Sequence, residues 1–86
     1  MNKSKIIKTL QEMDWLSKHW RVKDFIVVED EKSIVFEYQH GDMGLIEKVR
    51  YNKEDGYTEI YDLDNYYGRE VLYHSLYLPN INGDYI

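Results

Sequence analysis

The stretch FIVVEDEKSIVFEYQHGDMGLIEKVRYNKEDGYTEIYD, residues 25–62, decides the fold of this chain. It contains four runs rich in β-branched and aromatic residues, and three short polar turns separate them. Turns of this length join antiparallel neighbours, so the sequence predicts a four-stranded meander in the order 1-2-3-4. The expected strands cover residues 25–29, 34–39, 45–51 and 57–62.

The pairing register of these strands can be tested against the side-chain pattern. A four-residue loop at 41–44 pairs Phe36 with Val49 on one face and Glu37 with Lys48 on the other. A slip by one residue would place Lys48 in the core. The sequence therefore predicts an inner, core-facing side that carries Ile26, Val28, Ile34, Phe36, Tyr38, Tyr51, Val49 and Ile60. The expected outer side carries Phe25, Val27, Val35, Glu37, Lys48, Arg50, Tyr57, Glu59 and Tyr61. Because some of these residues are apolar, we expect the C-terminal segment or a partner to cover this side.

The N-terminal segment has the pattern of an amphipathic helix over residues 3–20. Its apolar stripe recurs at helical spacing, so the helix is expected to cover the inner face of the sheet. Trp15 lies far from that stripe. Either the helix ends near Asp14 and Trp15 folds back onto a sheet edge, or Trp15 is an exposed contact residue. The stripe consists of Ile6, Leu10, Met13, Leu16 and Trp20.

The C-terminal segment is compatible with two structures. Asp64 or Asn65 could cap a helix that runs to Leu78, and this is the preferred interpretation. Residues 71–74 also alternate as in a strand, and Gly68 is costly inside a helix. With the helix preferred, the expected fold is a single α+β domain over residues 1–86: an N-terminal helix packed on the four-stranded meander, followed by a C-terminal helix.

The composition argues against catalysis and metal binding. Without cysteine, the chain has no thiol nucleophile or zinc–thiolate site, and its three histidines lie in different elements. The segment 62–68 resembles a calcium loop but lacks the bidentate glutamate such a loop needs. We therefore expect a protein that is not an enzyme and has no metal site or cofactor. No apolar run is long enough for a transmembrane helix, and a cytoplasmic location is expected.

The charge of the chain is uneven. The net charge is -5, yet residues 1–23 carry six Lys/Arg against two Asp/Glu, and from Glu54 onward seven carboxylates face the single cation Arg69. Seven of the nine tyrosines lie between residues 57 and 85. Tyrosine supplies contact area at a low entropic cost, and carboxylates attract a basic partner. The predicted partner-binding residues are Tyr57, Glu59, Tyr61, Asp62, Asp64, Tyr66 and Tyr67.

A small, cysteine-free, acidic and aromatic-rich chain resembles, in general character, the inhibitors that bacteriophages and mobile elements direct at nucleic-acid enzymes. Anti-restriction, anti-CRISPR and uracil-glycosylase inhibitor proteins are examples, and the likeness is one of size and composition without a shared motif. It implies a protein, in some cases a DNA mimic, that occupies a basic nucleic-acid-binding surface of a host protein. Two alternatives remain: a small regulatory or nucleic-acid-binding domain that acts through the basic N-terminal helix, and an antitoxin or immunity protein. Direct nucleic-acid binding is disfavoured by the negative charge beyond residue 23.

Overall fold

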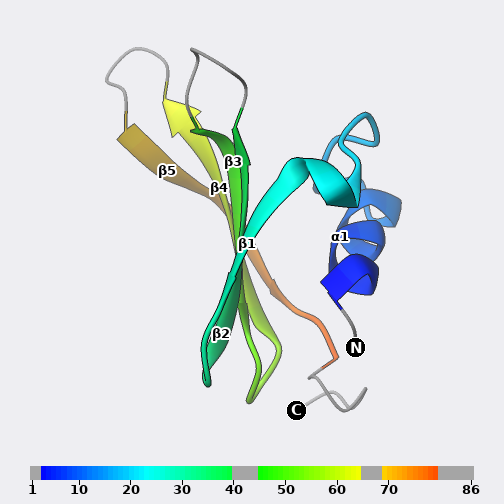
Figure 1. Ribbon diagram of the computed structural model, residues 1–86, viewed down its shortest axis with the longest axis vertical. Helices are drawn as coiled ribbons and strands as arrows, with labels where there is room; N and C mark the ends of the chain where they lie inside the picture. Colours follow the sequence, from blue (N-terminus) through cyan, green and yellow to red (C-terminus); the bar gives the residue numbers. More distant parts are fainter. Residues whose placement is uncertain (1–2, 40–44, 65–68, 80–86) are drawn as a thin grey trace.

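The computed structural model describes residues 3–39, 45–64 and 69–79 of the chain. One α-helix and a short 3-10 helix precede five β-strands (Figure 1). The elements are α1 (Lys3–Glu12), η1 (Val22–Asp24), β1 (Phe25–Glu29), β2 (Ser33–Gln39), β3 (Leu45–Asn52), β4 (Tyr57–Asp64) and β5 (Arg69–Tyr77).

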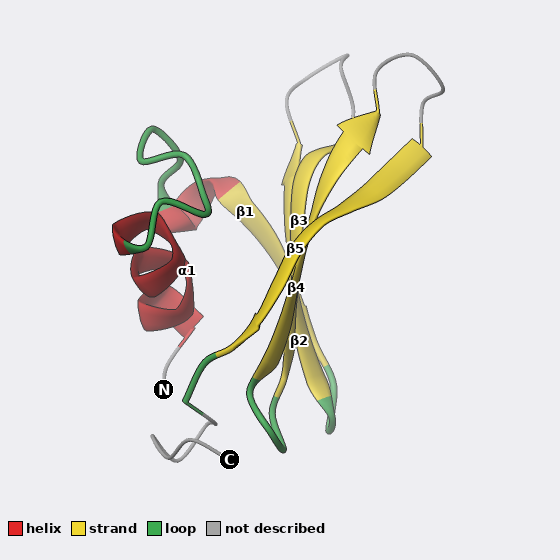
Figure 2. Ribbon diagram, turned by 180° about the vertical axis from the view of Figure 1, so that it is seen from behind, coloured by secondary structure: helices red, strands yellow, loops and turns green. Residues whose placement is uncertain are grey.

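The described residues form two layers, a helix and a twisted antiparallel sheet. The strands follow one another in the order β1-β2-β3-β4-β5, so the sheet is a meander. Figures 1 and 2 show α1 and the loop after it on one side of the sheet only. We call the side that faces α1 the inner face and the opposite side the outer face. No element among the described residues covers the outer face.

The predicted register of the central strands is confirmed. Phe36 pairs with Val49 and Glu37 pairs with Lys48, and Val49 in turn pairs with Ile60 on β4. Apolar residues thus gather on the inner face, where burial removes their surface from water and supplies the main favourable term in folding. The buried core consists of Ile6, Ile7, Leu10, Leu16, Phe25, Ile34, Phe36, Val49, Tyr51, Ile60 and Leu78.

The assignment of the two faces of β1 was wrong by one residue. Phe25 pairs with Tyr38 and is buried, whereas Ile26 and Val28 are 50% and 60% exposed on the outer face. The cause lies in the turn, where an Asp30 carboxylate oxygen accepts the backbone N–H groups of residues 32 and 33 at 2.8 and 2.7 Å. Asp30 N–H also donates to the Ser33 carbonyl, so only Glu31 and Lys32 form the turn between the paired residues. A slip of one residue exchanges the faces of the whole strand, so Phe25 and Val27 face inward.

The expected C-terminal helix was also wrong, because residues 69–77 form the strand β5. This strand pairs antiparallel with β4, so that Thr58 lies opposite Leu76 and Tyr57 opposite Tyr77. Without β5, the eight residues of β4 would leave a row of unpaired backbone groups at the edge of the sheet. Residues 69–77 therefore form a strand instead of the expected helix, because only a strand can supply hydrogen-bond partners along the edge of β4.

The helix α1 ends at Glu12 and does not continue to residue 20. Asp14 takes a left-handed conformation at φ 65°, Trp15 N–H donates to the Leu10 carbonyl, and Asp14 N–H donates to the Gln11 carbonyl. This pair of hydrogen bonds is a Schellman motif, which ends a helix and turns the chain. Consequently Met13 is 45% exposed instead of lying in the core. The first of the two interpretations of Trp15 is confirmed, since Trp15 packs on β5.

Candidate functional site

Three of the predicted partner-binding residues lie together on the outer face. Tyr57, Glu59 and Tyr61 alternate along β4, so their side chains share one side of the sheet. The ring of Tyr57 contacts that of Tyr77 on β5 with a centroid distance of 5.1 Å. The Lys48 Nζ lies 5.8 Å from the Tyr61 ring centroid. Burial, and secondly Glu59, raise the pKa of Tyr61, so its hydroxyl remains protonated at neutral pH.

The other predicted residues do not join this group. Asp62 lies on the inner face, opposite Glu47 in the strand ladder. Asp64 is the last residue of β4 and pairs with Arg69. Tyr66 and Tyr67 lie outside the described residues. The alternation of a strand thus divides a group of residues that is continuous in the sequence.

The charges on the outer face alternate in sign between neighbouring strands. Glu37 on β2 pairs with Lys48 on β3, and Arg50 on β3 pairs with Glu59 on β4. Lys48 Nζ also forms an ion pair with Glu70 on β5 at 3.3 Å. The outer face is therefore not a continuous acidic surface. Opposite charges that face each other across strands instead stabilise the sheet, each pair by about 0.2–1 kcal/mol.

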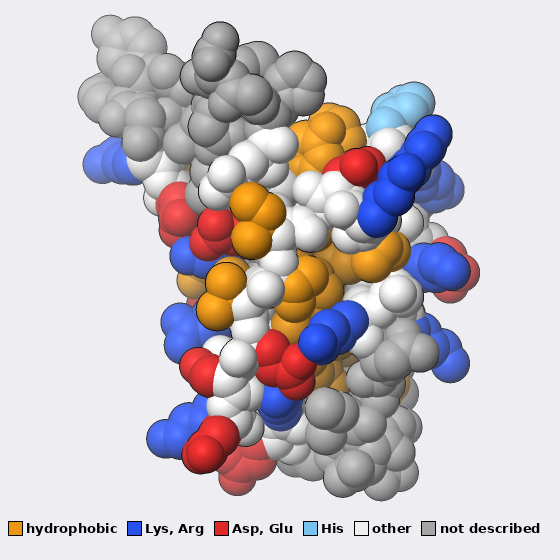
Figure 3. All heavy atoms as spheres, viewed as in Figure 1, with side chains coloured by type: hydrophobic (Ala, Val, Ile, Leu, Met, Phe, Trp, Pro, Cys, Tyr) orange, Lys and Arg blue, Asp and Glu red, His pale blue; other side chains and the backbone are white. Residues whose placement is uncertain are grey.

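Apolar side chains lie at both margins of the outer face. Ile26 and Val28 are exposed on β1, and Leu72 and Tyr77 are 50% and 57% exposed on β5. Figure 3 views the molecule as in Figure 1, with β1 in front. In this view, hydrophobic side chains reach the molecular surface between charged ones. Exposed apolar groups at both margins of one sheet face are typical of a contact surface, since a fully solvated face would carry few of them.

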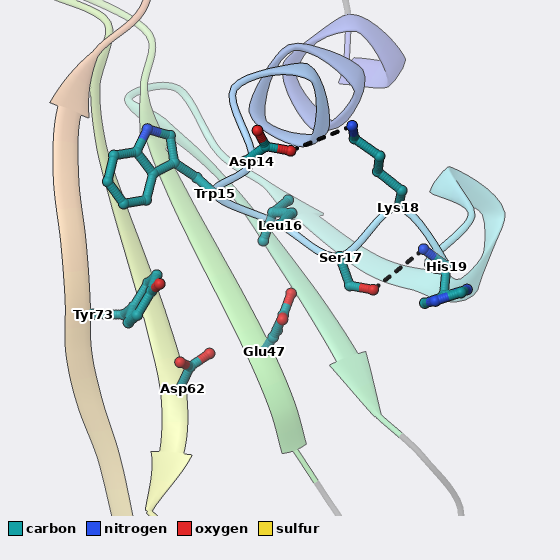
Figure 4. A pocket seen from close by; sticks show the side chains of 9 residues that line it. All are labelled: Asp14, Trp15, Leu16, Ser17, Lys18, His19, Glu47, Asp62 and Tyr73. Atoms are coloured by element: carbon teal, nitrogen blue, oxygen red, sulfur yellow. Dashed lines mark hydrogen bonds and ion pairs between the residues drawn. The ribbon is translucent and has the colours of Figure 1, made fainter.

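A pocket lies on the other side of the sheet, between the loop that follows α1 and the inner face (Figure 4). Its volume is about 440 Å³. The indole of Trp15 forms one wall, stacked on His74 with a centroid distance of 3.5 Å and edge-on to Tyr73 at 6.2 Å. We call this the acidic pocket, and the residues that line it are Asp14, Trp15, Leu16, Ser17, Lys18, His19, Glu47, Asp62 and Tyr73.

Two carboxyl groups form the floor of the acidic pocket. Glu47 and Asp62 are cross-strand partners on β3 and β4. Burial raises the pKa of Glu47, the indole N–H of Trp20 opposes this rise, and the charge of Asp62 adds to it. Burial also raises the pKa of Asp62. The Oε2 atom of Glu47 and the Nε1 atom of Trp20 are buried without hydrogen-bond partners, so the indole faces the carboxylate without reaching hydrogen-bonding geometry.

Sequence reasoning missed this pocket, although a signal for it was present. The register that pairs Val49 with Ile60 also places Glu47 opposite Asp62 on the inner face. Two carboxylates on the core side of a sheet are unusual, because burial of a charge is costly. The aromatic wall could not be read from the sequence, since it depends on the loop that brings Trp15 to β5.

Replacing Glu47 by glutamine should raise the free energy of unfolding at neutral pH by about 0.5–2 kcal/mol, the usual size of a stabilising substitution. The folded-state pKa of Glu47 lies above its ordinary value of 4.5, so the contribution of this group to stability is fully present below that value. That contribution is lost as the pH rises through the folded pKa, because the charge is less favourable in the folded chain. Urea unfolding between pH 4 and pH 8 measures the free energy of unfolding at each pH. The decrease with rising pH that is due to Glu47 should be absent in Glu47→Gln.

The matched control for this experiment is Glu54→Gln, a change of the same type at an exposed turn residue. Surface changes of this kind usually alter stability by less than about 0.5 kcal/mol. A lower stability of Glu47→Gln at pH 7, or an unchanged pH profile, would contradict the unfavourable burial of the charge.

Comparison of the chain with protein-family models, curated proteins and solved structures finds no match. No helix among the described residues is long and apolar enough to cross a membrane. In the same part of the chain, no three His, Cys, Asp or Glu side chains are grouped so that they could hold a metal ion.

Proposed function

We propose that this α+β domain is a non-enzymatic binding protein that occupies a basic, nucleic-acid-binding surface of a partner protein. The class of protein is that of the small inhibitors that phages and mobile elements direct at nucleic-acid enzymes. The observation that carries the proposal is the outer face, which no described element covers and which has exposed apolar side chains at both margins.

The dimensions of the outer face suit a protein interface. The five strands have five to nine residues, a mean of about seven. At a spacing of about 4.8 Å between strands and about 3.3 Å per residue, they cover about 24 by 24 Å, or about 600 Å² in projection. A standard interface buries about 800 Å² of each partner. A partner that covers the outer face would contact the apolar residues at both margins. Tyr57 and Tyr77 contribute the large rings that are enriched in binding hot spots.

Charge has two separate roles in the proposed contact. The net charge of -5 attracts a basic surface at long range and raises the association rate. At short range, the alternating acids and bases of the outer face select one orientation of the partner. Of the residues predicted from the sequence, Tyr57, Glu59 and Tyr61 keep their assigned role, and Ile26, Val28, Leu72 and Tyr77 are added to them.

The alternative of nucleic-acid binding through α1 has less support from the contacts of its basic residues. Lys3 Nζ on α1 forms an ion pair with Glu29 at 2.6 Å, and Lys18 Nζ in the loop after α1 forms one with Asp14 at 3.3 Å. A phosphate group would have to compete with these carboxylates. An antitoxin or immunity protein would use the same kind of surface as an inhibitor and would differ in its partner.

Two outer-face substitutions should affect partner binding in different ways. Tyr77→Ala should mainly raise the dissociation rate, with a loss of about 1–2 kcal/mol or more if the ring is a hot spot. Glu59→Lys should lower the association rate and weaken its salt dependence, because it removes negative charge that steers the encounter. Affinity capture from the host identifies the partner, and surface plasmon resonance at several salt concentrations then measures both rates.

The matched control is Lys5→Glu with Lys8→Glu on the exposed side of α1. This double variant should leave the dissociation rate unchanged. If only the helix variant abolishes binding, or if the protein shifts random duplex DNA at moderate salt, the proposed function is wrong and the helix is the contact surface.

A further inference from the structure

We propose that the free edge of β1 is a dimerisation surface, at which β1 pairs antiparallel with β1 of a second copy of this chain. Among the described strands, β1 and β5 lie at the two ends of the sheet, and β1 pairs only with β2. Figure 1 shows β1 in front of the other strands, with its free edge turned to the viewer. An edge strand presents backbone groups that can pair with another strand. The inference does not depend on the proposed function, because edge-to-edge pairing leaves the outer face free.

The register of β1 against β2 shows which backbone groups point to the free edge. Asp30 N–H donates to the Ser33 carbonyl, so these two residues form a hydrogen-bonded pair. Such pairs alternate along an antiparallel ladder, and every second residue before Asp30 therefore also directs its N–H and C=O groups to β2. The residues between them direct these groups away from β2. The residues that point to the free edge are Phe25, Val27 and Glu29.

A two-fold axis through Val27 brings these backbone groups together. Val27 would exchange two hydrogen bonds with Val27 of the second copy, and each Glu29 N–H would donate to the Phe25 carbonyl of the other copy. The Phe25 N–H takes no part, because it already donates to the Val22 carbonyl. An axis through either neighbour of Val27 would pair fewer of the five residues of β1. The length of the strand therefore favours the register that is centred on Val27.

The same axis covers the apolar side chains that β1 exposes. Ile26 would lie opposite Val28 of the second copy on the outer face, in a pair without backbone hydrogen bonds, where side chains come closest. These two residues are the most exposed ones of the apolar run 25–28. Val27 is 38% exposed although it faces inward, so α1 does not close over this margin of the sheet. In the dimer Val27 would contact its counterpart, and apolar surface would be removed from water on both faces.

The opposite edge of the sheet is less suited to pairing. β5 is longer and also exposes apolar residues, but its register against β4 shifts between Ile60 and Tyr61. Such a bulge bends a strand and is one of the features that protect an edge from pairing. β1 pairs with β2 without a shift, and residues 25–28 contain neither a charged residue nor a proline. Pairing of β1 with β1 also closes as a dimer, whereas pairing of β1 with β5 would leave edges free for further copies.

The size of the contact predicts a weak dimer. Five residues at about 3.4 Å each, in a sheet about 10 Å thick, give a strip of about 170 Å² in projection. A standard interface buries about 800 Å² of each partner, so this contact should be transient. We expect a dissociation constant on the order of 0.1–1 mM.

Sedimentation and amide hydrogen exchange at protein concentrations from about 20 µM to about 2 mM test the proposal across the expected dissociation constant. The weight-average mass should rise with concentration toward that of two chains. The Val27 and Glu29 amides point to solvent in the monomer, so their exchange should slow as the concentration rises. The Val28 amide is already paired with β2 and should change less. This measurement uses the unaltered protein and therefore does not depend on the folding of any variant.

Two double variants test the register. Ile26→Lys with Val28→Lys should lower the association constant about tenfold or more, because lysines would face lysines across the axis. Ile26→Lys with Val28→Glu should associate more strongly than the first variant, since each lysine would then face a glutamate of the other copy. Both positions are exposed in the single chain, so both variants should fold.

The matched control is Val71→Lys with Leu72→Lys, which adds the same charge to exposed positions on the opposite edge strand. It should dimerise as the unaltered protein does, apart from the effect of the added net charge, which the first β1 variant shares. The proposal is overturned if the unaltered chain stays monomeric at about 2 mM, well above the expected dissociation constant. It is also overturned if the Val27 and Glu29 amides exchange equally fast at all concentrations, or if the control loses association while both β1 variants keep it.

Discussion

Replacing Phe36 by alanine should lower the free energy of unfolding by about 3–5 kcal/mol, the usual cost of truncating a buried phenylalanine. Phe36 is completely buried at the centre of the inner face, between Val27 on β1 and Val49 on β3. Its ring also contacts Phe25 edge-on, with a centroid distance of 6.4 Å. The truncation removes apolar surface from the core and leaves a cavity that the paired strands on both sides cannot close.

A loss of this size is large for so short a chain. Stability of roughly 0.05–0.15 kcal/mol per residue implies a total of about 4–13 kcal/mol for 86 residues. Chemical denaturation followed by tryptophan fluorescence should show a midpoint strongly shifted to lower urea, or a protein that is already partly unfolded in buffer. Val35→Ala is the matched control, because Val35 is the next residue of the same strand on the outer face. If the control unfolded the protein while Phe36→Ala had no effect, the two faces of the sheet would have been assigned in reverse.

Replacing Gly56 by alanine should cost about 2–4 kcal/mol, because it combines backbone strain with a steric overlap. Gly56 has φ +78°, a conformation that L residues with a side chain rarely adopt. A Cβ atom at this position would overlap the backbone carbonyl oxygen of Leu78. The Leu78 N–H donates to the Gly56 carbonyl at 2.9 Å, so the two segments cannot separate without losing a hydrogen bond.

The expected loss extends beyond the turn, because Gly56 positions the chain that follows β5. Leu78 is buried in the core, and the Tyr51 hydroxyl donates to the Pro79 carbonyl just after it. Amide hydrogen exchange should therefore show faster exchange at Leu78 as well as around residue 56. Glu54→Ala in the same turn is the control, since its side chain is exposed and a change within about 0.5 kcal/mol is expected. Equal stability of Gly56→Ala and Glu54→Ala would contradict the close approach of Gly56 to the Leu78 carbonyl.

The central part of the fold could be predicted because its signals are local and agree with one another. Between β2 and β3, and between β3 and β4, one register brings apolar residues together and also opposes Glu37 to Lys48. For β1 the apolar run 25–28 has no alternation, so its two faces looked equivalent in the sequence. Only the turn could decide between them, and the two hydrogen bonds to the Asp30 carboxylate decided it.

The candidate sites were predictable to a smaller extent. Tyr57, Glu59 and Tyr61 could be assigned to one face by strand alternation, and the structure has them there. The exposed residues of β5 were missed because the segment was expected to be a helix. The acidic pocket was missed because it needs both the inner-face pair Glu47 and Asp62 and the return of Trp15 to the sheet.

By itself, the sequence of this protein determined the antiparallel meander, the register of its central strands and the amphipathic start of α1. These properties follow from side-chain periodicity and composition, which act between near neighbours in the chain. Only the tertiary structure decided that α1 stops at Glu12, that residues 69–77 are a strand, and that Trp15 packs on His74. The local hydrogen bonds of the Schellman motif end α1, whereas contacts with distant residues decide the other two cases. The edge of β4 pairs with β5, and the Trp15 indole stacks on His74, and neither partner can be identified from its local sequence.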